Sequence, residues 1–306
     1  MALGPEKLVV SRLKLGIVDS SVGNGHMFSF SSLFNGYEAS ELARCPFPAI
    51  INYLPKHVTP VSTLSRKAEV SAVWMHDLEY AKKVARFGKI SRVYNDINSL
   101  IANVDGIIIT NDEPVGRESV LESCLTSGKI VFIDKMIART SKNLEKWLSL
   151  QRYPGQLYCA SAISFSTAVK EISWDVNTDY MVFTSPKNWS NYGIHLVDSF
   201  LTFASLNNLE YEIGKISHSE TTTERQINIL NPGGGRIFLR TEGRADVNFS
   251  IIASKNGYKQ EVTISDPFDS FTSMLDTWLS REPADTYMSE HKRYAEAVAI
   301  LGSEHE

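Results

Sequence analysis

Short apolar runs alternate with stretches of helical spacing over about the first 135 residues, and this alternation limits the fold more than any other feature. The runs are LKLGIV, VSAVWMH, VDGIIIT and KIVFIDK, all rich in β-branched residues. Such runs are typical of parallel strands covered on both faces. Between them lie DLEYAKKVARFG and EPVGRESVLESCLTSGK, and the second ends near a glycine suited to a helix C-terminus. The order predicts right-handed βαβ units and a Rossmann-like, doubly wound parallel sheet.

The pattern changes beyond about residue 150 to consecutive strand-like runs. They are YCASAIS, TDYMVFTSP, YEIGKISHSET, QINILN, GRIFLRTEG, DVNFSIIAS and YKQEVTIS. NPGGG and KNGYK are turn signals between some of them, one helix (GIHLVDSFLTFAS) interrupts them, and two more close the chain. We therefore predict a Rossmann-like domain over residues 1–137 and an α+β domain with a large, mostly antiparallel sheet over residues 138–306.

Composition excludes several classes of protein. The 306 residues are 43% hydrophobic and 22% charged, as in globular proteins, and the net charge of -4 comes without a basic patch for nucleic acid. The first residues show no signal-peptide pattern, and no apolar run approaches the roughly 20 residues that cross a bilayer. Cys45, Cys124 and Cys159 lie far apart without metal-ligand spacing. We expect a cytoplasmic protein with reduced thiols and with no metal, nucleic-acid or membrane partner.

The segment GIVDSSVGNGHMFSF combines a strand with a glycine-containing turn. In one interpretation Gly23 and Gly25 let the backbone approach a pyrophosphate, and Asn24 tolerates a left-handed conformation. In the other, the glycines serve only the geometry of a strand-to-helix turn. Asp19 stands where the first glycine of a dinucleotide fingerprint is expected, and its charge opposes a pyrophosphate there.

The end of the second strand carries no ribose-binding acid at the usual position. Met75 occupies that place, His76 follows, and Asp77 comes two residues later. Asp77 also suits the N-cap of the following helix. The choice between NAD and NADP therefore stays open.

Two long segments resemble the glucose–fructose oxidoreductase and inositol dehydrogenase family (Gfo/Idh/MocA type). In YNDINSLIANVDGIIITNDEPVGRESVLESCLTSGKIVFIDKM, the family's "vD", "aGK" and "EKP" correspond to Val104-Asp105, Gly128-Lys129 and Asp134-Lys135-Met136. NYGIHLVD resembles its "D.G.H..D" helix, and DPFDSFTSMLDTWL resembles a late helix. GNGHMFSFSSLFNGY is similar to a branch linked to surface-sugar biosynthesis.

The resemblance implies hydride transfer between NAD or NADP and a hydroxyl-bearing carbon of a sugar or polyol, nucleotide-linked sugars included. It implies Lys135 and His195 as catalytic residues, with Asn191 at the place of the family's aspartate. It also implies a homo-dimer or tetramer formed through the large sheet of the substrate domain. The candidate cofactor-binding residues are Gly23, Asn24, Gly25, Met75, His76, Thr110 and Asn111.

The residue types suit this chemistry. A lysine at the carboxyl end of a parallel strand projects into the crevice where such sheets bind ligands. A neutral imidazole takes a proton near operating pH, and Asn191 and His195, four apart, share one helix face. Equally, a lysine at a strand end is often a solvated charge, and a lone histidine on an apolar helix is often a packing residue.

Five positions depart from the family pattern. Met136 replaces a proline, Arg117 a histidine, Ser164 an arginine, Asp19 a glycine and Met75 an acid. Together they support an alternative: a diverged member that binds a sugar or nucleotide without redox turnover. A third possibility is a redox-neutral reaction with a tightly held cofactor.

Overall fold

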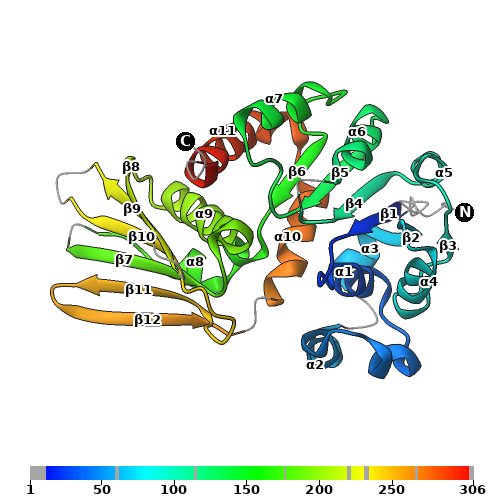
Figure 1. The fold of residues 1–306 in the computed structure, drawn as a ribbon, viewed down its shortest axis with the longest axis horizontal. Coiled ribbons are helices and arrows are strands. Elements are labelled where there is room, and N and C mark those ends of the chain that lie inside the picture. Colours follow the sequence, from blue (N-terminus) through cyan, green and yellow to red (C-terminus); the bar gives the residue numbers. More distant parts are fainter. Residues whose placement is uncertain are drawn as a thin grey trace, which may run out of the picture. The chain divides into compact units, whose positions relative to one another are not determined.

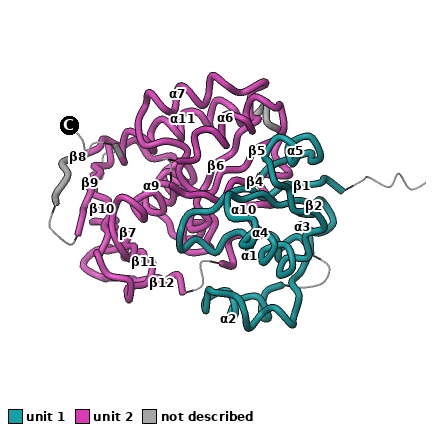
Figure 2. Tube along the Cα trace, turned by 45° about the vertical axis from the view of Figure 1, so that its right-hand side comes forward, with its two compact units in different colours: residues 1–108 teal, residues 109–306 magenta. Residues whose placement is uncertain are grey.

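The computed structural model describes residues 12–58, 62–113, 116–175, 177–218, 222–230, 234–265 and 268–302. The chain forms two compact units, residues 1–108 and 109–306, shown in two colours in Figure 2. The division falls inside strand β4 (Gly106–Thr110). The domain boundary at residue 137 stays a prediction.

Sheet A has the strand order β3-β2-β1-β4-β5-β6, and its pairings are parallel where the register is defined. Besides β4, its strands are β1 (Leu13–Ser20), β2 (Ala68–Trp74), β3 (Arg92–Val93), β5 (Ile130–Asp134) and β6 (Leu157–Ala160). The buried, β-branched sequences of β4 and β5 suit strands covered on both faces. The predicted Rossmann-like parallel sheet is confirmed.

Helices follow these strands as the sequence pattern predicts. In the first unit they are α1 (His26–Asn35), the 3-10 helix η1 (Ala39–Arg44), α2 (Pro48–His57), α3 (Thr63–Lys67), α4 (Leu78–Phe87) and α5 (Ile97–Ala102). The Asp77 carboxylate accepts a hydrogen bond of 2.9 Å from the Tyr80 amide. Asp77 is therefore the N-cap of α4, one of the two roles that the sequence left open.

The second unit contains the remaining helices. They are α6 (Glu118–Thr126), α7 (Ser141–Ser149), the 3-10 helix η2 (Ala162–Phe165), α8 (Thr167–Glu171), α9 (Trp189–Leu206), α10 (Asp269–Ser280) and α11 (Pro283–Gly302). Gly128 follows α6 with a φ of 78°, as expected for a glycine that ends a helix. The predicted helix within the second half is α9, and the two predicted at its end are α10 and α11.

Sheet B has the order β12-β11-β7-β10-β9-β8. Its strands are β7 (Thr178–Ser185), β8 (Tyr211–His218), β9 (Thr223–Ile229), β10 (Arg236–Thr241), β11 (Phe249–Lys255) and β12 (Tyr258–Ile264). The β7–β10 pairing is parallel, whereas the other four pairings are antiparallel. Asn256 and Gly257, with φ of 51° and 79°, form the predicted tight turn of the β11–β12 hairpin. The other predicted turn, NPGGG, falls partly outside the described residues.

One strand expectation was wrong. YCASAIS was predicted as the first strand of the second sheet, but β6 pairs in parallel with β5 in sheet A, and residues 162–165 form η2. All four residues of β6 are buried. Continuous burial is typical of a strand covered on both faces, and it carries no alternation from which the sheet can be identified.

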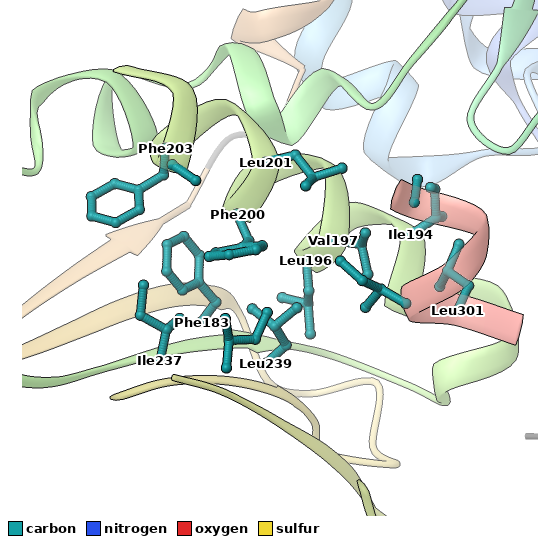
Figure 3. Close-up of a cluster of buried hydrophobic side chains, with 14 of the residues drawn as sticks. Phe183, Ile194, Leu196, Val197, Phe200, Leu201, Phe203, Ile237, Leu239 and Leu301 are labelled. Atoms are coloured by element: carbon teal, nitrogen blue, oxygen red, sulfur yellow. The ribbon is translucent and has the colours of Figure 1, made fainter. Parts of the chain in front are cut away.

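Helix α9 covers one face of sheet B (Figure 1). Ile237 and Leu239 of β10 are buried against it, and Phe183, Phe200 and other members of this core appear in Figure 3. The alternate β10 residues Arg236 and Arg240 are exposed on the opposite face. Within the described parts of the chain, no helix has the length and apolar character needed to span a membrane.

Candidate functional site

Three consecutive strands of sheet A end in polar residues of the second unit. Asp112 follows β4, Lys135 follows β5 and Ser161 follows β6. Because parallel strands present their carboxyl ends at one edge, this is the edge where such sheets bind ligands. Lys135 Nζ lies 2.5 Å from Asp112 Oδ2, and the two side chains are only 15% and 24% exposed. The pair is thus a partly desolvated ion pair at the ligand-binding edge.

Lys135 has an unusual backbone conformation. Its φ is 64°, in the left-handed region that costs a residue with a side chain roughly 1–2 kcal/mol. The Cys159 thiol of the neighbouring strand donates to the Lys135 carbonyl oxygen. Burial lowers the pKa of the Lys135 ammonium, but Asp134 and Asp112 outweigh this effect, so the pKa is raised. Lys135 is therefore held in its charged form.

Arg117 is fully buried beside this pair, with an exposed fraction of 1%. Its guanidinium donates to the backbone carbonyl oxygens of Asn111 (2.8 Å), Ile137 (3.0 Å) and Met136. Burial lowers the pKa of Arg117, while nearby groups, led by Cys159 and Asp134, oppose that shift. Where the family pattern has a histidine, this chain thus has an arginine, and its hydrogen bonds connect the loop after β4 with the loop after β5.

His195 lies on the buried side of α9 and is 8% exposed. Its Nδ1 is 2.6 Å from Ser161 Oγ. The centroid of its ring is 5.2 Å from that of Tyr192 and 5.4 Å from that of Phe249. Tyr192 also contributes to raising the pKa of Lys135. Ser161, which binds His195, follows β6, and β6 pairs with β5, the strand that precedes Lys135.

A buried polar network supports Ser161. The Asp198 carboxylate accepts from the Ser161 amide at 2.7 Å and from the Ser164 hydroxyl at 3.0 Å. Arg293 of α11 donates to the same carboxylate at 2.8 Å through Nε and at 2.5 Å through Nη2. Arg293 Nη2 also lies 3.5 Å from Ser164 Oγ, so a guanidinium from α11 reaches the position where the family pattern has an arginine.

The sequence reasoning missed Asp112, Ser161, Asp198 and Arg293. Asp198 follows His195 by three residues and so shares its helix face, which was a usable signal. Ser161 could have been found if β6 had been assigned to the parallel sheet. Nothing in the local sequence indicates that Arg293 reaches Asp198.

Asn191 is placed differently from the expectation. It lies in the first turn of α9, is exposed, and its amide donates to Asn188 Oδ1 at 3.0 Å, which caps the helix. The hydrogen-bond partner that the structure gives His195 Nδ1 is Ser161.

The end of β1 and the turn after it contain two left-handed residues, Asp19 (φ 53°) and Gly23 (φ 81°). Asn24, which tolerates that conformation, does not have a positive φ. Asn24 instead accepts a hydrogen bond of 2.8 Å from the His26 amide, as its side chain suits a turn before a helix. Asp19 is 5% exposed, and its Oδ1 accepts from the Ser20 amide at 3.0 Å.

Gly25 is required by packing. A Cβ atom there would lie 2.6 Å from Ile50 Cδ1 and 2.9 Å from the Phe47 ring, whereas a Cβ on Gly23 would meet nothing within 4 Å. The first turn of α1 contains no acidic residue. An open Gly23 and a helix N-terminus fit the phosphates of a dinucleotide, and the Asp19 carboxylate opposes them.

The other predicted cofactor residues end strands of sheet A. Met75 is half-buried after β2, and the exposed His76 has its ring 4.8 Å from that of Trp74. Thr110 and Asn111 are buried at the end of β4. The Asn111 side chain accepts from the Glu113 amide at 2.9 Å and so shapes the loop that carries Asp112.

No protein-family profile and no curated protein matches the sequence. Solved structures do match in fold. Myo-inositol 2-dehydrogenase from Lactobacillus plantarum has a TM-score of 0.65 and 10% identity, over 95% of each chain. Myo-inositol dehydrogenase from Lactobacillus casei, in complex with NAD(H) and myo-inositol, has a TM-score of 0.60 and 13% identity. The match covers 96% of this chain and 93% of that one.

A Gfo/Idh/MocA family oxidoreductase from Vibrio cholerae is similar to this chain with a TM-score of 0.61 and 11% identity, over 95% of this chain and 96% of that one. At such identities the likeness concerns the fold, and it extends over both halves of the chain. The order of a parallel sheet followed by a mostly antiparallel one agrees with it. The chain therefore has the fold of the Gfo/Idh/MocA oxidoreductases, the family that its sequence segments resemble.

Proposed function

We propose that this chain is an NAD(P)-dependent oxidoreductase that transfers a hydride to or from a hydroxyl-bearing carbon of a sugar or polyol, nucleotide-linked sugars included. The observation that carries the proposal is that Lys135 and Ser161 follow the paired strands β5 and β6 of one compact unit, and that Ser161 is hydrogen-bonded to His195. The polyol dehydrogenases of the same fold support this substrate class.

The two side chains would divide the proton chemistry between them. The Lys135 ammonium, held charged by Asp112, donates a hydrogen bond to the substrate oxygen and lowers the pKa of that hydroxyl. His195 Nε2 takes the hydroxyl proton, which requires that Nδ1–H donates to Ser161 Oγ. A bound nicotinamide supplies the hydride acceptor, or the donor in the reverse direction.

The cofactor would be held by residues from three strand ends of sheet A. We assign the phosphates to the turn of Gly23, Asn24 and Gly25 at the start of α1. Met75 and His76 follow β2, at the usual place of the ribose-binding residue. Thr110 ends β4, and Asn111 follows it.

A second candidate function is binding of a sugar or nucleotide without redox turnover. The buried Asp19 carboxylate favours it, because it brings negative charge into the turn where a pyrophosphate would lie. The packing of Phe47 and Ile50 against Gly25 gives that glycine a role that needs no ligand.

Titration of the purified protein with NAD⁺, NADH, NADP⁺ and NADPH, followed by fluorescence, separates the two candidates. Binding of at least one form is expected of the oxidoreductase, and binding of none of the four would overturn it. Lys135→Ala should then lose turnover of the accepted polyol and keep cofactor affinity. Lys142→Ala, an exposed lysine of α7, is the matched control and should keep both.

We also propose a homo-dimer or tetramer built on the face of sheet B opposite α9. Along β7 and β10 that face carries the partly exposed Tyr180, Val182 and Phe238 beside exposed arginines. Light scattering coupled to size exclusion tests this assembly, and a monomer at all concentrations would contradict it.

A further inference from the structure

We propose that Arg117 and Asp112 are positioning residues for Lys135: the buried guanidinium fixes the loops after β4 and β5, and the carboxylate holds the ammonium in place. The inference deepens the proposed function, because it assigns to two further residues the task of orienting the lysine. It rests on contacts within the second unit.

Arg117 acts on the backbone on both sides of the ion pair. Its Nη1 binds the carbonyl of Asn111, the residue before Asp112, and its Nη2 binds the carbonyls of Met136 and Ile137, the two residues after Lys135. A guanidinium carries five N–H donors in a rigid plane, so one side chain can serve both loops. A lysine at this position has one nitrogen and cannot reach the same set of carbonyls with the same geometry.

The backbone at Lys135 needs such support. Its left-handed φ of 64° persists only where the surroundings fix it. In the pattern that the sequence resembles, a proline follows the lysine and restricts the chain, whereas here Met136 follows. Arg117, together with the Cys159 thiol on the Lys135 carbonyl, restrains the same peptide units through hydrogen bonds.

Asp112 fixes the other end of the lysine. Its Oδ2 accepts a hydrogen bond from Nζ at 2.5 Å, and the opposite charges of the two groups strengthen that bond. Asp134, which ends β5, and Tyr192 of α9 also act on the ammonium. Asp112 is the carboxylate that meets it from the loop after β4.

The test measures Lys135 directly. Lysines are labelled by reductive ¹³C-methylation, and the Lys135 signal is assigned by its absence in Lys135→Arg. In Asp112→Asn its titration midpoint should shift to lower pH, because the uncharged amide no longer stabilises the ammonium. Glu113→Gln, an exposed carboxylate one residue away, is the control and should leave the midpoint in place. An unchanged midpoint in Asp112→Asn would overturn the role of Asp112.

Arg117 is tested by backbone hydrogen exchange. In Arg117→Lys the amides of residues 111–113 and 136–138 should exchange faster, with those of sheet B unchanged. Arg152→Lys, which removes an exposed guanidinium bound to one carbonyl, is the control. Equal exchange in Arg117→Lys and the parent would overturn the role of Arg117. If that variant does not fold, hydrogen exchange in the parent protein tests the role of Arg117 instead. The amides of residues 136–138 must then be protected to the same degree as those of β5.

Neither measurement needs cofactor or turnover, so the inference and the proposed function fail separately. If none of the four nicotinamide cofactors binds, the proposed oxidoreductase function is overturned, but the positioning of Lys135 by Asp112 and Arg117 is not. Where turnover is found, Asp112→Asn should lower kcat on the order of 10²-fold, as expected for a displaced catalytic group, with cofactor affinity kept.

Discussion

Ser161 Oγ lies 2.6 Å from His195 Nδ1 and joins the end of β6 to the middle of α9 across 34 residues of sequence. The serine is itself fixed, because its amide donates to Asp198. A histidine whose Nδ1 is bound in this way presents Nε2 in a defined orientation. The predicted base is therefore oriented by a serine of sheet A, while Asn191 lies exposed at the start of the helix.

Ser161→Ala should reduce turnover without abolishing it. His195→Gln should lower kcat by about 10²–10⁴-fold, because it removes the group that transfers the proton. Ser161→Ala should lower kcat by less, because the imidazole remains. The ¹⁵N shifts of His195 should also show a change of tautomer in Ser161→Ala, a readout that needs no substrate. Ser173→Ala, an exposed serine, is the control. Unchanged imidazole shifts in Ser161→Ala would show that this contact does not orient the ring.

Arg293→Met should destabilise the protein by about 3 kcal/mol, because it leaves the Asp198 carboxylate without its buried counter-ion. The Asp198 side chain is only 7% exposed, so water can replace little of the loss. Lys292→Met, the exposed neighbour on α11, should cost less than about 0.5 kcal/mol. Urea unfolding measures both variants, and equal losses would contradict a stabilising role of the pair.

His291 should make the stability depend on pH. Burial lowers the pKa of His291, so the folded state binds fewer protons than the unfolded chain, whose histidines titrate near about 6.5. The free energy of unfolding therefore rises with pH in the window between the lowered pKa of His291 and about 6.5. As the pH falls through this window, the stabilising contribution of the neutral imidazole is lost. His291→Gln should flatten this part of the profile, measured by urea unfolding from about pH 5 to about pH 8. Met288→Gln, on an exposed site of α11, should keep the parent's slope.

Asp19→Gly should strengthen binding of any nicotinamide that the protein accepts. The backbone already has a φ of 53°, which glycine adopts without strain, and the substitution removes a negative charge from the turn. Calorimetric titration against the parent measures the change, with Glu38→Gln as a control for net charge. Weaker binding in Asp19→Gly would show that the carboxylate itself contacts the ligand.

Sequence patterns predicted most strands of both sheets: β4 and β5 are continuous apolar runs, and β9 and β10 alternate between buried and more exposed residues. They gave no sign of β3, which has only two residues. They were insufficient at β6, whose four buried residues are too few to show a period. Asp77 was correctly weighed as a cap, since capping depends on local chemistry.

The candidate site was predicted as far as residues follow strands or share a helix face. Lys135 and His195 were proposed from the family resemblance, and their catalytic roles stay a prediction. Arg293 and Arg117 were missed in their observed roles, because their partners are carbonyl oxygens and a carboxylate that the chain brings near only on folding. A resemblance in motif predicts which residue types recur, but it gives no information on compensating contacts at positions that have changed.

Gly25→Ala separates the two interpretations of the glycine turn. The added methyl group would meet Ile50 Cδ1 at 2.6 Å, so we expect a loss of about 1–3 kcal/mol by overpacking. Ile50→Val removes that Cδ1 atom, and the double variant should be more stable than the sum of the single losses predicts. If Gly25 also serves the approach of a phosphate, the double variant should regain stability and still bind nicotinamide more weakly than Ile50→Val alone. If the double variant regains both stability and nicotinamide affinity, Gly25 serves packing only. If the losses in unfolding free energy of the two single variants are additive, the contact with Ile50 is contradicted.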